Sequence, residues 1–94
     1  MYSLDEEIEV LEDVDVLEKN AHKLVLYNDD VNSFDWVITC LMKYCKNTQE
    51  QAEQNAWFVH FKGKAIVKSG EVRKLKPMCE ALCENGLSAK VEED

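Results

Sequence analysis

Basic residues are scarce in this chain of 94 residues: 11 Lys and Arg stand against 19 Asp and Glu, and the formal net charge is −8. Eight of the acids lie within residues 1–20, which hold a single Lys. Tight binding to nucleic acid or to an anionic membrane surface needs a concentrated excess of Lys and Arg. The composition therefore argues against both, and we expect protein partners, no nucleic acid and no membrane.

Long apolar segments are also missing. No run approaches the roughly 20 residues of a membrane-spanning helix, and the first 19 residues are too acidic and too interrupted for a secretory signal peptide. We therefore expect a cytoplasmic protein. In that compartment the four cysteines, Cys40, Cys45, Cys79 and Cys83, are expected to be reduced thiols rather than disulfides.

Glycine and proline are absent from residues 1–20, where acids alternate with apolar residues. Such a segment could form a marginal strand or an acidic tail. We interpret residues 1–20 as a flexible acidic tail. Residues 21–94 are nearly neutral and long enough for one domain with one core.

Turn-forming and capping residues divide this domain into six elements. Ser33 suits a helix N-cap, Thr48 with Gln51 forms a capping box, and Lys62-Gly63 ends a helix. The expected order is a strand at 23–27, helices beginning after Ser33 and Thr48, a strand at 65–67 followed by a turn at Ser69-Gly70, a third helix ending at Asn85-Gly86, and a strand at 88–92. Three short strands cannot bury a core alone. The pattern therefore predicts an α+β fold in which a three-stranded antiparallel sheet is covered by three helices, in the order β-α-α-β-α-β.

Two helices carry unusual sequences. The end of the second, residues 56–61, is apolar nearly all round, so we expect it to be packed on several sides. The third contains Pro77, which removes a hydrogen bond, so we expect a kink there or a helix start close to Leu75. Its expected inward residues are Val72, Leu75, Cys79, Leu82 and Cys83.

The segment 28–32 is the first candidate for chemistry, since Asn28, Asp30 and Asn32 alternate as in a calcium-binding loop. Ser33 replaces the glycine that such a loop needs, and Thr39 stands where its bidentate glutamate belongs. A calcium site is therefore not supported, and a strand-to-helix turn with local side-chain caps explains the segment.

Catalytic and metal motifs are weak as well. His60 has apolar neighbours typical of a core or rim residue, and the cysteines are separated by four and three residues rather than by the two of zinc ribbons. No nucleophile motif or paired acid and base marks a reacting centre. We expect no enzyme and no cofactor. A metal- or thiol-dependent site built on the cysteines and His60 remains the alternative.

Taken together, Leu-Tyr-Asn-Asp-Asp at a strand end, a capped helix, and a second helix ending in Val59-His60-Phe61-Lys62-Gly63 resemble the ClpS family of Clp protease adaptors. The similarity runs over about residues 23–92. It implies a protein that binds the N-terminal residue of substrates beginning with Leu, Phe, Tyr or Trp and delivers them to a Clp-type ATP-dependent protease. The resemblance places Asn28, Asp30 and His60 on the substrate α-amino group, with Asp29 beside them.

By the same resemblance, the pocket for the first side chain is lined by Asn32, Phe34, Val37, Ala56 and Val59. Glu71 and Lys76 correspond to charges that face the N-terminal domain of the Clp unfoldase; read without the family, they are a solvated helix face. Phe34 and Ala56 depart from the family, where methionine is often found. We expect a monomer, and an assembly module that lacks an amine pocket is a further alternative.

Overall fold

The computed structural model describes residues 22–93, so the predicted acidic tail, residues 1–20, lies outside the described residues. The elements confirm the predicted order β-α-α-β-α-β. They are β1 (His22–Tyr27), α2 (Phe34–Tyr44), α3 (Gln49–Lys62), β2 (Lys64–Gly70), α4 (Val72–Glu84) and β3 (Ser88–Glu93). Between residues 22 and 93, no helix is long and apolar enough to cross a membrane.

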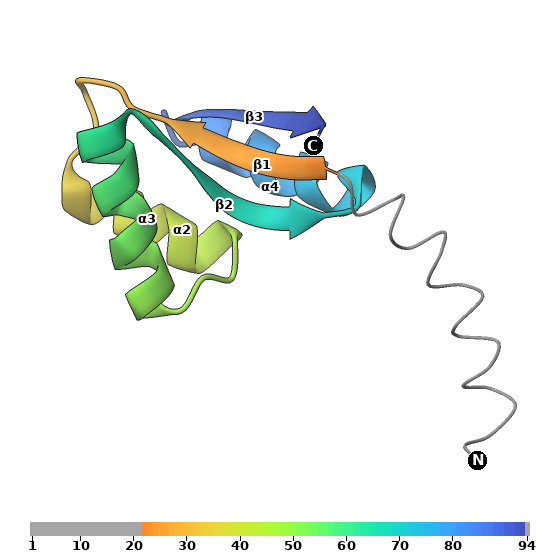
Figure 1. The fold of residues 1–94 in the computed structure, drawn as a ribbon, viewed down its shortest axis with the longest axis horizontal. Helices are drawn as coiled ribbons and strands as arrows, with labels where there is room; N and C mark the ends of the chain where they lie inside the picture. The colour runs from red at the N-terminus through yellow and green to blue at the C-terminus, as the bar shows by residue number, and fades with distance from the viewer. Residues whose placement is uncertain (1–21, 94) are drawn as a thin grey trace, which may run out of the picture.

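The sheet has the order β2-β1-β3, with β1 antiparallel to both neighbours. Alternate residues of β1 face opposite sides, and Leu24 and Leu26 join the core formed with all three helices. Figure 1 shows α2 and α3 together at one end of the sheet and α4 along its strands. The predicted α+β architecture, with helices on one face of an antiparallel sheet, is therefore confirmed.

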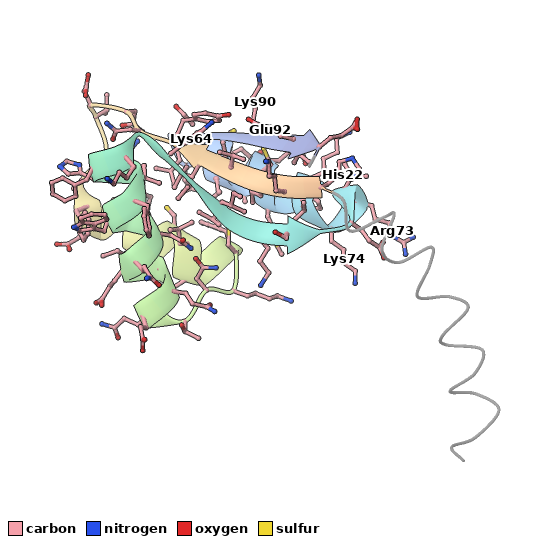
Figure 2. The ribbon with its side chains drawn as sticks, viewed as in Figure 1. His22, Lys64, Arg73, Lys74, Lys90 and Glu92 are labelled. Carbon is pink, nitrogen blue, oxygen red and sulfur yellow. The ribbon has the colours of Figure 1, made fainter. Side chains whose placement is uncertain are left out.

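The opposite face of the sheet carries polar side chains around the apolar residues Val25 and Ile66. In the strand register, Val25 pairs with Ile66 on β2 and with Lys90 on β3. Figure 2 shows Lys90 pointing away from the helices. Tyr27 donates a hydrogen bond from its hydroxyl to the carboxylate of Glu92, and this bond, with some burial, raises the pKa of Tyr27.

The helix boundaries follow the predicted capping residues. Ser33 Oγ accepts from the Trp36 backbone N at 3.1 Å, and Thr48 and Gln51 form both hydrogen bonds of a capping box. Gly63, at φ 95°, ends α3 in the left-handed conformation that favours glycine. Strand β2 is longer than the expected 65–67, because Ser69 and Gly70 pair with β1 rather than forming a turn.

Helix α4 corrects two expectations. It begins at Val72 and continues through Pro77 to Glu84, so a start close to Leu75 is wrong. Leu75 and Leu82 are buried as predicted, but Val72 and Cys83 are exposed. At about 100° per residue, Val72 and Cys83 lie roughly 70–90° around the helix from the direction of Leu75 and Leu82.

The end of α3 was predicted to be packed on several sides, and this is wrong. Helix α3 buries Ala52, Ala56 and Val59 on a single face. The aromatic residues on the other side remain open: Trp57 is 45%, Phe58 40% and Phe61 62% exposed. The Trp57 ring contacts the rings of Phe58 and Phe61, but the core does not cover any of the three.

Candidate functional site

One small pocket lies where the end of β1, the following loop, the start of α2 and the end of α3 meet. It brings together eight of the nine residues that the sequence assigned to the amine and the side-chain pocket. Asp30 is exposed and does not line it. The lining residues are Leu26, Tyr27, Asn28, Asp29, Asn32, Phe34, Val37, Ala56, Val59, His60 and Leu87.

The carboxylate of Asp29 shapes the loop between β1 and α2. Its Oδ1 accepts hydrogen bonds from the backbone N of Val31 and of Asn32, both at 2.8 Å, and its Oδ2 accepts from Asn32 Nδ2 at 3.0 Å. Partial burial alone would raise the pKa of Asp29, but the hydrogen bonds from Asn32 and Val31 outweigh it and hold the pKa below its ordinary value of 3.8. Asp29 thus fixes the conformation of the loop between β1 and α2, which carries Asn28 and Asn32.

Asn32 ties this loop to the distant turn between α4 and β3. Its Nδ2 donates to the backbone oxygen of Gly86 at 2.7 Å, while Trp36 Nε1 donates to the oxygen of Asn85 at 3.1 Å. Gly86 has φ 88°, a conformation that favours glycine. These contacts bring Leu87 to the pocket wall. Sequence reasoning missed Leu87, because nothing local marks a residue whose place depends on a contact 54 positions away.

Asn28 and His60 face the pocket with unused polar groups. The backbone N of Asn28 donates to the oxygen of Gly63 at 2.9 Å, which joins the end of β1 to the end of α3. Within residues 22–93, neither the side-chain amide of Asn28 nor the imidazole of His60 makes a hydrogen bond. The His60 ring stands edge-on to Phe34, with ring centroids 6.3 Å apart. An amide oxygen and an imidazole nitrogen are both acceptors for an N–H donor.

The pocket is narrow. Val37, Ala56 and Val59 are buried in its wall, and its volume is about 20 Å³, which is about the room of a single water molecule. Phe34 also lines the pocket and is 39% exposed. An aliphatic or aromatic side chain can enter only if Phe34 or the loop moves.

The cysteines do not gather into a site. Cys40 and Cys45 are buried, and burial raises the pKa of both thiols, that of Cys45 to about 11. Burial and the nearby Cys83 thiol raise the pKa of Cys79. Among residues 22–93, no group of three or more His, Cys, Asp or Glu is placed to hold a metal ion. The alternative based on metal or thiol chemistry gains no support from this arrangement.

Glu71, which directly precedes α4, and Lys76, in α4, are not part of the pocket lining. Glu71 is the N-cap residue of α4, and its carboxylate accepts from Arg73 Nε at 2.8 Å while its side chain is only 14% exposed. Lys76 is exposed. Of the two residues, Lys76 is therefore the more accessible to a partner.

Comparison with known proteins agrees with this fold. Residues 17–90 match the family model described as the ATP-dependent Clp protease adaptor protein ClpS. A Clp protease adapter protein ClpS from Thermosynechococcus vestitus is 38% identical over 68 residues, which is 71% of this chain and 72% of that protein. One from Campylobacter jejuni is 34% identical over 92 residues, covering 92% and 96% of the two chains.

A solved structure shares the fold. Agrobacterium tumefaciens ClpS2, bound to L-phenylalaninamide, superposes with a TM-score of 0.71 at 23% identity, over 78% of this chain and 95% of that one. Fold and family model together define the class as a Clp protease adaptor. The chain belongs to the ClpS family.

Proposed function

We propose that this protein binds the free N-terminal residue of other proteins and delivers them to a Clp-type ATP-dependent protease. The observation that carries the proposal is one pocket in which unpaired acceptors on Asn28 and His60 border an apolar wall of Val37, Ala56 and Val59. An N-terminal residue offers the matching pair of groups, a protonated amine and a side chain. A protein of the same fold, ClpS2, is bound to L-phenylalaninamide.

The α-ammonium group is the donor in this scheme. It carries three N–H bonds and a positive charge, which the Asn28 amide oxygen and an unprotonated nitrogen of His60 accept. Asp29 and Asp30 lie in the same loop and add negative charge beside them. Each charge-assisted hydrogen bond contributes about 1.5–3 kcal/mol, so a few of them suffice to recognise a peptide end.

The first side chain enters the apolar part of the pocket, past Phe34. Its walls would be formed by Asn32, Phe34, Val37, Ala56 and Val59, together with Leu87. Burial of a Leu or Phe side chain contributes about 2–3 kcal/mol, and part of this offsets the cost of widening the narrow pocket. We therefore expect Leu, Phe, Tyr and Trp as first residues.

Delivery completes the proposal. Glu71 and Lys76, on α4, are proposed to contact the N-terminal domain of the Clp unfoldase. The adaptor would act as a cytoplasmic monomer, without catalysis and without a cofactor.

Fluorescence anisotropy with labelled peptides that differ only in their first residue or in N-acetylation tests the binding step. A peptide beginning with Leu or Phe should bind, and its acetylated form should not, because acetylation removes the charge and N–H donors. His60→Ala and Asn28→Ala should each weaken binding at least about tenfold. Met42→Ala, an exposed apolar residue of α2 outside the pocket, is the matched control and should bind normally. Equal affinity for free and acetylated peptides would refute the proposal.

A further inference from the structure

Three aromatic side chains of α3, Trp57, Phe58 and Phe61, form an open surface that we call the aromatic ridge. Trp57 is in contact with Phe58 (ring centroids 5.4 Å apart) and with Phe61 (5.0 Å). All three are at least 40% exposed. Neighbouring exposed aromatic rings of this kind give a small domain an apolar surface to which another molecule can bind.

The ridge is continuous with the pocket. His60, which lines the pocket, stands edge-on to Phe61 with ring centroids 4.8 Å apart, and on its other side it is edge-on to Phe34. A chain of touching rings therefore leads from the pocket mouth through His60 and Phe61 to Trp57. A ligand that contacts His60 is therefore close to Phe61, the nearest ring of the aromatic ridge.

The far end of the ridge opens onto a second hollow. Phe58 lines a groove of about 410 Å³ on the uncovered side of the sheet, together with Val25, Ile66 and Lys64. Ile66 is 52% exposed in this groove. The pocket of about 20 Å³ and this larger groove thus lie at the two ends of one aromatic path.

We propose that the aromatic ridge is a second subsite, which binds an aromatic or large aliphatic side chain at the third to fifth residue of the protein whose first residue is in the pocket. This inference rests on the proposed function, because the first residue supplies the anchor. An extended chain advances about 3.3 Å per residue, so these residues lie roughly 7–13 Å beyond the first. The centroid separations are 4.8 Å from His60 to Phe61 and 5.0 Å from Phe61 to Trp57, so the Trp57 ring lies at most about 10 Å from His60, within the reach of these residues.

The bound segment is chosen over other occupants because the ridge adjoins the pocket. His60 lines the pocket and its ring contacts Phe61, so the residues that follow an anchored first residue are the nearest apolar groups available to the ridge. Aromatic side chains pair with exposed rings in edge-on or offset geometry and lose little conformational freedom. The protein would then select for a pattern, an anchoring first residue followed by a nearby aromatic, rather than for the first residue alone.

The test compares labelled peptides that begin with Phe and continue either with glycine and serine only or with one Trp at the third, fourth or fifth position. At least one Trp-containing peptide should bind about tenfold more tightly than the glycine-serine peptide. Trp57→Ala and Phe61→Ala should each remove most of this gain and leave the affinity for the glycine-serine peptide unchanged. Met42→Ala, which removes a comparably exposed apolar side chain from α2, should retain the gain.

The outcomes distinguish failure of the proposed function from failure of the second subsite. If the glycine-serine peptide fails to bind at all, the proposed function fails. If it binds but no Trp position adds affinity, or if the gain survives both Trp57→Ala and Phe61→Ala, the second subsite is refuted while the proposed function stands. A ridge that pairs two copies of the chain would show as a Trp57→Ala change in sedimentation without a change in the peptide gain, and this result would also overturn the subsite.

Discussion

The side-chain amide of Asn32 donates to the backbone oxygen of Gly86 at 2.7 Å and so joins the loop after β1 to the turn before β3. Its second amide hydrogen reaches Asp29 Oδ2. The side chain of Asn32 therefore lines the pocket and also connects two other parts of its wall, the carboxylate of Asp29 and the turn that places Leu87.

Replacing this side chain should loosen the pocket. Asn32→Ala removes two hydrogen bonds of about 0.5–1.5 kcal/mol each, and about 1 kcal/mol lowers the thermal midpoint of a domain this size by roughly 4–8 °C. Peptide affinity should fall as well. Thr39→Ala is the matched control, since it also removes a side-chain hydrogen bond, to Asp35 O within α2, but lies outside the pocket. Calorimetry and anisotropy check both effects, and equal peptide affinities of the two variants would contradict the role of Asn32.

Asp29 should make stability depend on pH. Its folded-state pKa lies below the ordinary value of 3.8, so its stabilising effect is fully present above that value and is lost as the pH falls through the lower folded-state pKa. Asp29→Asn should therefore cost about 1 kcal/mol at pH 6, and the difference from the natural chain should shrink below about pH 4. Denaturant unfolding at several pH values measures this. A difference that stays constant down to pH 3 would show that ionised Asp29 does not hold the loop.

The sequence predicted the elements with strong local signals. Ser33, the Thr48 and Gln51 box and Gly63 act within a few residues, so the boundaries of α2 and α3 could be predicted. Burial was harder to predict, because it depends on which direction of a helix the sheet covers. Val72, Cys83 and Phe61 are apolar but lie off the buried direction of their helices, and composition cannot show this.

Only some residues of the pocket could be predicted from the sequence. Asn28, Asp29 and Asn32 are neighbours in sequence, and the family resemblance linked them to His60. Leu26, Tyr27 and Leu87 were missed because their place in the pocket comes from the sheet and the Gly86 turn. The small volume of the pocket could not be predicted either, since it depends on how the lining side chains pack against one another.

Ala56 is the pocket residue whose size should control which first residues bind. It is buried and lines the pocket. Ala56→Met should reduce the affinity for Trp-initiated peptides more than for Leu-initiated ones, because overpacking a formed site costs about 1–3 kcal/mol and the larger side chain needs more room. Ala52→Met is the control: Ala52 lies on the same buried face of α3 but outside the pocket, so it should leave the ratio of the two affinities unchanged. The same ratio in both variants would show that Ala56 does not limit the pocket.

Alkylation should separate the cysteines by exposure. Only the thiolate reacts, and burial raises the pKa of Cys40 and Cys45. In the native protein, iodoacetamide at pH 8 should therefore modify exposed Cys83 first, with Cys40 and Cys45 reacting at least about a hundredfold more slowly. Mass spectrometry of proteolytic peptides follows each site, and unfolding in denaturant should equalise the rates. Rapid modification of Cys45 in the native protein would instead support the alternative of a thiol-dependent site.

The acidic tail should matter for delivery and not for binding. Residues 22–93 form a three-stranded sheet, three helices and the pocket, and on this basis we predict that the tail is not required for peptide binding. Deleting residues 2–18 should leave the thermal midpoint and the peptide affinity nearly unchanged. A chain segment with high charge and little apolar surface is suited to spanning two proteins or to being engaged by a motor. The same deletion should therefore slow degradation of a Leu-initiated reporter by the partner Clp protease.

A control variant replaces residues 2–18 by a glycine-serine segment of equal length. It separates the role of tail length from the role of tail sequence, because it restores the length without restoring the sequence. Loss of peptide binding or of the cooperative transition on deletion would show that residues 2–18 are part of the folded domain.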